Sequence, residues 1–161
     1  MPVLRRLKEV MDRAQISYEV YNHPRAFTAQ EIAATQHITG RAMAKVVILN
    51  VDGSLAMAVL PSNRLVDIEL AKAGLAATNV SLATEEQFAT IFPECELGAM
   101  PPFGNLFGLP VIVDPALERN ESIFFNAGNH LQTVRLKYRD FKLLVKPDMI
   151  TLTEGRRKKA A

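Results

Sequence analysis

Apolar residues recur at two different spacings along the first third of the chain, and each spacing predicts a different element. In residues 3–15 they fall at helical intervals, whereas "SYEVYNH" (17–23) alternates and predicts a short strand. Thr28 and Glu31 have the three-residue spacing of a capping box, so a helix is expected to begin there. This part of the chain is therefore predicted to fold as helix, strand and helix.

The strongest hairpin signal is "MAKVVILNVDGSLAMAVLP" (43–61), in which Asp52-Gly53 separates two apolar runs. Pro61 is expected to end the second strand. The segment "NRLVDIELAKAG" that follows is amphipathic and predicts a helix, with Gly74 as the residue just past its end.

The second half of the chain alternates short strands with helices. Thr84 is expected to cap a helix over "EEQFATIF", and Pro147 to end a helix over "YRDFKLLVK". Strands are predicted in "TNVSLAT", "LPVIVDP", "SIFFNAG" and "QTVRLKY". Because no regular βαβ rhythm appears, we predict an α+β fold with a mixed or antiparallel, barrel-like sheet surrounded by helices. We expect a single domain over residues 1–150 and a basic C-terminal tail over 151–161.

Composition narrows the class of protein. The chain has 161 residues, of which 48% are hydrophobic and 22% charged, as in a soluble globular domain. With Cys95 as the only cysteine, an intramolecular disulfide and a cysteine-based zinc site are excluded, and a reducing cytoplasmic location is expected. Because we find no signal-peptide core and no apolar run of 18 residues, we expect neither secretion nor contact with a membrane.

The net charge of +2 depends on the tail. Removing Arg156, Arg157, Lys158 and Lys159 would change it to −2. A polyanion would therefore be bound by a local patch or by the tail, although such a tail is often only solvated.

Lys45 is the first candidate for chemistry, because it interrupts an apolar run. A lysine whose aliphatic stem lies along apolar surface can present its ammonium in a cleft, where it would suit an anionic or carbonyl substrate. The alternative is a lysine on an edge strand that reaches into solvent.

The loop "GAMPPFG" (98–104) is the second candidate. Its prolines, Pro101 and Pro102, fix the loop's shape before any ligand binds. Such a loop can polarise an ester carbonyl with preorganised donors, or it can be only a rigid connector. Backbone N–H groups are available at Gly98, Ala99, Met100 and Phe103.

The third candidate is "NAGNH". The small residues at Asn126, Ala127 and Gly128 would let a ligand approach the end of a strand closely. His130 could transfer a proton, form a hydrogen bond or be structural. HExxH, GxSxG and GxGxxG motifs are absent from the sequence, so we predict no metal and no cofactor.

The order of these features resembles the YbaK/prolyl-tRNA synthetase-associated editing domain family. The features are an early tyrosine before a His-Pro turn, "TAQE", a lysine before a hairpin, Gly-x-x-x-Pro and a glycine at a strand end. The resemblance extends from about Tyr18 to Pro147. It implies the fold of that family and a deacylase that hydrolyses mischarged aminoacyl-tRNA.

The resemblance also implies roles for individual residues. Lys45 corresponds to the invariant lysine of the family, and Gly98 to Pro102 to its Gly-x-x-x-Pro loop. Tyr21 corresponds to a tyrosine that lines the pocket, and Asn126 stands where some relatives carry serine. The implied catalytic residues are Lys45, Gly98, Ala99 and Met100; the implied substrate-binding residues are Tyr21, Pro101, Pro102, Phe103, Asn126, Ala127, Gly128 and His130.

The expected substrate is a mischarged tRNA that carries a small amino acid of the Ala or Ser/Thr type, with tRNA-Pro as one candidate. Lys45 would bind the terminal phosphate or the carbonyl region, the loop would face the oxyanion, and a ribose hydroxyl would position the water. Two alternatives stay open: a non-catalytic module that binds tRNA or a synthetase, and a hydrolase of small aminoacyl esters. A synthetase is a further expected partner, and the chain is expected to be a monomer or a weak homodimer.

Overall fold

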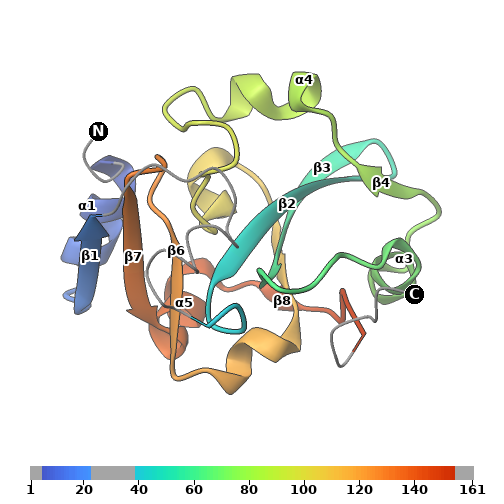
Figure 1. The fold of residues 1–161 in the computed structure, drawn as a ribbon. Helices are drawn as coiled ribbons and strands as arrows, with labels where there is room; N and C mark the ends of the chain where they lie inside the picture. The colour runs from blue at the N-terminus through green and yellow to red at the C-terminus, as the bar shows by residue number, and fades with distance from the viewer. Residues whose placement is uncertain (1–4, 23–38, 155–161) are drawn as a thin grey trace.

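Two β-sheets and the helices around them make up the fold (Figure 1). The computed structural model describes residues 5–22 and 39–154. One sheet has the strand order β4-β2-β3-β5-β8, and the other has the order β1-β7-β6. The predicted α+β class with a mixed sheet is confirmed. The predicted barrel-like closure is wrong, because the described strands divide between two open sheets that each keep free edges.

The hairpin of β2 (Ala44–Val51) and β3 (Ser54–Pro61) forms the centre of the larger sheet. Asp52 and Gly53 connect the two strands with φ angles of 49° and 89°. Positive φ at both central residues is the pattern of a type I′ turn, whose twist matches that of the two strands. The predicted hairpin is confirmed.

The larger sheet is mixed because its outer strands run in both directions. β4 (Val80–Leu82) is antiparallel to β2, whereas β5 (Val111–Val113) is parallel to β3. β8 (Asp148–Met149) adds a second parallel pair at β5. A strand of two residues carries too little pattern to be predicted from sequence.

Helix α3 (Ile68–Leu75) begins five residues inside the predicted segment (63–74) and ends one residue beyond it. Asp67 caps its N-terminus, and Ala76 ends it in the left-handed conformation, with φ 53°. Gly74 lies inside the helix, where an added Cβ would be 2.4 Å from Ile150 Cγ2. The prediction that Gly74 follows the helix is therefore wrong, because this glycine permits close packing of α3 on the C-terminal segment.

The smaller sheet consists of β1 (Tyr18–Asn22), β6 (Ser122–Asn126) and β7 (Gln132–Lys137), and all its pairs are antiparallel. α5 (Tyr138–Val145) follows β7 directly. β6 and β7 alternate, with one side of each strand in the main hydrophobic core. α1 (Arg5–Arg13) packs on the same core.

Short helical turns make the remaining connections. Thr84 and Gln87 form a capping box at the start of α4, which confirms the predicted cap. The turns are α4 (Glu85–Phe88), η1 (Ala89–Ile91), η2 (Gly104–Phe107) and η3 (Pro115–Arg119).

The fold continues past residue 150, where we expected the domain to end. Leu152 is fully buried, and Asp114 Oδ2 accepts hydrogen bonds from the backbone N–H groups of Leu152 and Thr153 at 2.8 and 3.1 Å. The predicted capping box at Thr28 and the four basic residues of the tail lie outside the described residues. Within the described ranges, no helix is long and apolar enough to cross a bilayer.

Candidate functional site

A row of three side chains crosses the smaller sheet. Thr133 on β7 pairs with Tyr21 on β1 and with Asn126 on β6. Residues directly opposite each other in a sheet share a face, and the sequence neighbours Phe125 and Val134 face the core, so this row lies on the other side. Thr133 and Asn126 are nevertheless buried. The sheet thus carries two buried polar side chains away from its apolar face.

Lys45 lies on the same side as this row. An isolated parallel bridge joins Met43 to Phe124, and strand alternation then places Lys45 on the side of Phe124 and Asn126. Ala44, between Met43 and Lys45, belongs to the main core. The beginning of β2 therefore brings the lysine next to the end of β6.

The environment of Lys45 suits an anionic ligand. The side chain is half-buried, and this burial lowers the pKa of its ammonium below the ordinary value of 10.5. No carboxylate in residues 5–22 or 39–154 forms an ion pair with it. A partly desolvated cation without a carboxylate partner is a candidate for binding a ligand.

The Gly98 loop begins with a tight turn. The Ala99 N–H donates to the Glu96 carbonyl at 3.0 Å, and Gly98 has φ 81°, as the third residue of a type II turn requires. Because this hydrogen bond occupies the Ala99 N–H, that group is not free to bind an oxyanion, contrary to our prediction. The N–H groups of Gly98 and Met100 have no acceptor within the described part of the chain.

Hydrogen bonds attach this turn to the end of β6. Asn126 Nδ2 donates to the Gly98 carbonyl at 3.3 Å, and Gly128 N–H donates to the Ala99 carbonyl at 2.9 Å. The Gly128 carbonyl accepts from the Glu96 N–H at 2.9 Å. The end of β6, where the small residues lie, therefore holds the loop in place. Asn126 contacts the loop and also lies on the side of the sheet that carries Lys45.

His130 holds the loop from behind. It is 2% exposed, its Nε2 lies 2.7 Å from the Leu97 carbonyl, and its backbone N–H donates to Glu96 Oε1 at 2.8 Å. Because a carbonyl can only accept, Nε2 must carry a proton. This geometry favours the hydrogen-bonding role for His130 over proton transfer.

Asn126 keeps one polar atom available. Because its Nδ2 faces the Gly98 carbonyl, the orientation of the amide is fixed and Oδ1 points elsewhere. Oδ1 is buried and has no hydrogen-bond partner among the described residues. Buried acceptors are rarely left unpaired, so this oxygen is a candidate contact for a ligand donor.

Two residues predicted to line the substrate pocket lie in the core instead. Phe103 is fully buried, with its ring 5.6 Å from that of Phe125 and 6.0 Å from that of Phe141. Ala127 is also fully buried in this core. Small and apolar residues can line a pocket or pack in a core, and in this structure both side chains pack in the core. Neither residue is placed to touch a substrate.

The remaining predicted residues lie around the loop and the row. Pro101 and Pro102 are buried, and they continue the loop into the core. The Tyr21 hydroxyl donates to Glu19 Oε1 at 3.0 Å, which raises the pKa of Tyr21, and the ring lies 6.2 Å from that of Phe124. Tyr21 therefore lies on the same face of the sheet as Asn126, two strands away.

Sequence reasoning missed an apolar groove beside the loop. Its volume is about 270 Å³, and it extends along β2 from Val46 to Ile48. It is lined by Val46, Val47, Ile48, Leu82, Ala83, Glu85, Phe88, Leu97, Gly98 and Met100. Thr133 was missed as well, although its alternation with Val134 places it on the polar side of β7.

Metal ligands do not converge in the described part of the chain. Residues 5–22 and 39–154 contain no group of three or more His, Cys, Asp or Glu side chains placed to hold an ion.

Comparison with known proteins links this geometry to one family. The profile of the aminoacyl-tRNA editing domain family matches residues 23–144. The chain is similar to a multifunctional Ser/Thr-tRNA deacylase, ProXp-y, from Escherichia coli K12, with 29% identity over 125 residues, 73% of this chain and 74% of that protein.

Solved structures share the fold. One was solved as a candidate trans-editing enzyme for prolyl-tRNA synthetase; it has a TM-score of 0.79 and 18% identity, covering 94% of this chain and 96% of that one. Another, described only as a hypothetical protein, has a TM-score of 0.83 and 16% identity, covering 93% of this chain and 100% of that one. At these identities the likeness bears on the fold alone.

Proposed function

The chain belongs to the aminoacyl-tRNA editing domain family, and on this premise we propose that it hydrolyses in trans the ester of a mischarged tRNA that carries a small amino acid. The observation that carries the proposal is the position of Asn126. Its side chain bonds the loop at Gly98, and it lies on the same side of the sheet as Lys45, which forms no ion pair with any carboxylate of the described ranges.

The proposed reaction needs no protein nucleophile, because the aminoacyl ester is already activated. A water oxygen attacks the carbonyl carbon, and the bond from that carbon to the ribose oxygen breaks. The ribose oxygen takes up a proton, leaving a free amino acid and an uncharged tRNA. The neighbouring ribose hydroxyl positions the water.

Two parts of the site assist this step. Protonated Lys45 binds the 3′-terminal phosphate or the carbonyl region of the substrate. The N–H groups of Gly98 and Met100 stabilise the negative charge that develops on the carbonyl oxygen, and one such donor is worth roughly 10²–10³ in rate.

Asn126 is proposed to recognise the amino group of the substrate. An aminoacyl ester carries an α-ammonium that donates hydrogen bonds, and Asn126 Oδ1 is a buried acceptor that is still available. Binding there would orient the ester toward Gly98, whose carbonyl already fixes the Asn126 amide.

The proposed substrates carry serine, threonine or alanine, and tRNA-Pro is one proposed tRNA. The similar Escherichia coli protein is a Ser/Thr-tRNA deacylase, which supports this class. Binding alone separates near-isosteric side chains by about 1–3 kcal/mol, so a second site that admits only small residues improves accuracy. Met100, which lines the groove beside this loop, is proposed to set the size limit.

The experiment that tests the proposal is deacylation of a panel of mischarged tRNAs. Wild type and Lys45→Ala are compared, with Lys8→Ala as a control because Lys8 is an exposed lysine of α1. We expect wild type and Lys8→Ala to release the small amino acids and Lys45→Ala to release none. Equal rates for wild type and Lys45→Ala would refute the mechanism.

The same panel separates the alternatives. Binding of tRNA without hydrolysis of any substrate would indicate an accessory module for tRNA or a synthetase. Hydrolysis of a small aminoacyl ester at a rate insensitive to salt would indicate a small-molecule hydrolase, because contacts with tRNA phosphates weaken steeply as salt increases.

A further inference from the structure

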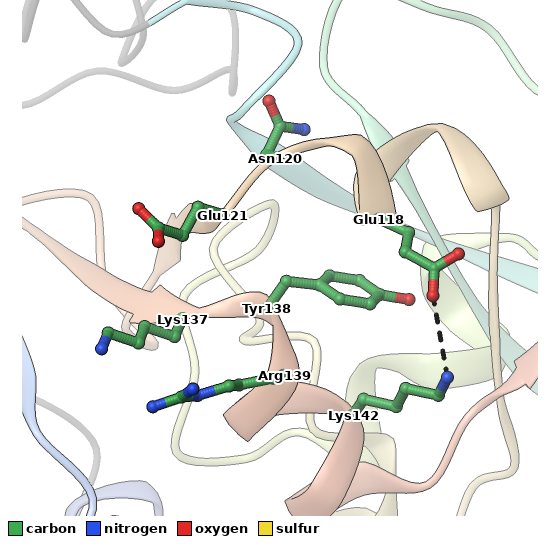
Figure 2. Close-up of a pocket in the computed structure, with 7 residues that line it drawn as sticks. All are labelled: Glu118, Asn120, Glu121, Lys137, Tyr138, Arg139 and Lys142. Carbon is green, nitrogen blue, oxygen red and sulfur yellow. Dashed lines mark ion pairs between the residues drawn. The ribbon is translucent and has the colours of Figure 1, made fainter.

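A second cavity, of about 360 Å³, lies at the other end of the β6–β7 pair (Figure 2). Ser122 pairs with Lys137 at this end, whereas Asn126 pairs with Thr133 at the end that holds the loop. Four residues of strand separate the two ends, or about 13 Å at 3.3 Å per residue. The cavity is therefore distinct from the site of the proposed hydrolysis. Its lining residues are Glu118, Asn120, Glu121, Lys137, Tyr138, Arg139 and Lys142.

Two of the three cations in this cavity are available to a ligand. Lys142 lies 3.7 Å from Glu118 and forms an ion pair with it. Lys137 and Arg139 form no ion pair with any carboxylate of the described ranges. The cavity thus combines unpaired positive charge with carboxylates at Glu118 and Glu121.

The N-terminus of α5 adds positive potential to the same cavity. Lys137 is its N-cap residue and provides no side-chain hydrogen bond to the first turn. The backbone N–H of Tyr138 donates to the Glu121 carbonyl, and Asp140 is the acidic residue of this turn. A helix of eight residues whose first turn lacks a capping side chain favours an anion at this end.

The hydroxyl of Tyr138 provides an independent sign of a ligand. Tyr138 is 5% exposed, and its hydroxyl has no hydrogen-bond partner among the described residues. Figure 2 shows this hydroxyl directed toward the pair of Glu118 and Lys142. Burial and the nearby Glu118 carboxylate raise the pKa of Tyr138, so the group stays a protonated donor at neutral pH.

We propose that this cavity binds a ribonucleotide unit. Lys137, Arg139 and the start of α5 would take the phosphate, and the carboxylate of Glu121 would accept hydrogen bonds from the ribose hydroxyls, as acidic side chains do in nucleotide sites. The Tyr138 hydroxyl would donate to the ligand from the floor of the cavity. A volume of about 360 Å³ is within the range of small-molecule sites.

The unit has two sources, a nucleotide within a tRNA chain or a free nucleotide. The first rests on the proposed function, since it would place the body of the substrate tRNA across β6 and β7 while its acceptor end lies at Gly98. The second is independent of the proposed function. A nucleotide from either source would present the same phosphate and ribose groups to the cavity.

The test uses the full chain as wild type, Arg139→Gln, Tyr138→Phe and the control Arg13→Gln, which removes an exposed arginine from α1. Affinity for uncharged tRNA is measured against salt concentration, and adenosine 5′-monophosphate and its 2′-deoxy analogue are titrated by NMR. For the tRNA source, we expect Arg139→Gln to weaken tRNA binding severalfold and to reduce the salt slope by about 1, whereas Arg13→Gln should leave both the affinity and the slope unchanged.

For the free-nucleotide source, adenosine 5′-monophosphate should shift the resonances of Tyr138 and Lys142 and bind better than its deoxy analogue. Tyr138→Phe should then bind it more weakly, with tRNA affinity unaltered. The proposal is overturned if wild type binds no nucleotide while Arg139→Gln binds tRNA like Arg13→Gln. It is overturned as well if Tyr138→Phe matches wild type for both ligands. Failure of the proposed function would be seen separately, as binding of tRNA without hydrolysis by the wild type.

Discussion

His130 and Leu97 are joined by a hydrogen bond of 2.7 Å between Nε2 and the main-chain carbonyl. The bond fixes the imidazole behind the turn that contains Gly98, and Glu96 binds the backbone of His130 from the same segment. His130 thus acts on the candidate site through the position of the loop.

The first prediction distinguishes this positioning role from proton transfer. His130→Gln keeps a side-chain donor, so deacylation should stay within about tenfold of wild type, or about 1.4 kcal/mol. His130→Ala leaves the Leu97 carbonyl unsatisfied and should lower the free energy of unfolding by about 1–3 kcal/mol as well as the rate. The measurements are denaturant unfolding and single-turnover deacylation. A loss of 10²-fold or more in a stably folded His130→Gln would instead indicate proton transfer.

The second prediction concerns the type II turn. Gly98→Ala places a Cβ at φ 81°, which should cost about 1–2 kcal/mol and displace the N–H groups proposed to face the ester. Gly108→Ala is the matched control, because Gly108 has φ 74° and open space around it, and it ends η2 outside the site. Both variants should lose stability by similar amounts in urea unfolding, whereas only Gly98→Ala should lose deacylation. Equal activity in the two would show that the turn does not contribute to catalysis.

Sequence patterns predicted the parts of the fold that depend only on residues close together in the sequence. Asp52-Gly53 specifies a turn by its own backbone preference, and Thr84 caps a helix by bonding a residue three positions away. Gly74 shows the limit of such reasoning. A glycine near the end of a helix can be a cap or a point of close contact, and here Ile150, far along the chain, decides between them.

The residues of the candidate site were proposed from the sequence, whereas their geometry comes from the structure. Lys45 was proposed because it interrupts an apolar run, and Gly98 because its loop is unusual. Whether the Ala99 N–H is free depends on the conformation of the turn, and a sequence with proline and glycine is compatible with several turn types. In this structure the turn uses that N–H in a hydrogen bond. Phe103 could equally have lined a pocket, and only its contacts with two other aromatic rings assign it to the core.

The third prediction separates the functional contribution of Lys45 from its effect on stability. Lys45→Met keeps most of the apolar stem and removes an ammonium that burial disfavours, so the free energy of unfolding should stay equal to that of wild type or rise. Deacylation should fall by 10²-fold or more, the scale of a lost electrostatic contact in the transition state. The two are measured by urea unfolding and by single-turnover kinetics. A stable variant with full activity would exclude Lys45 from the reaction.

The fourth prediction follows from the lowered pKa of Lys45 and concerns two pH dependences. In the folded protein this ammonium loses its proton below the ordinary pKa of 10.5, while the unfolded chain keeps it until near that value. Between the two values the unfolded state binds more protons, so the stability of wild type relative to Lys45→Met should rise with pH. Deacylation needs the charged form, so kcat/KM should fall with pH across the same window after subtraction of uncatalysed hydrolysis. Lys45→Arg stays protonated and, where it remains active, should keep its rate there. A fall in activity without the matching rise in relative stability would assign the alkaline limb to another group.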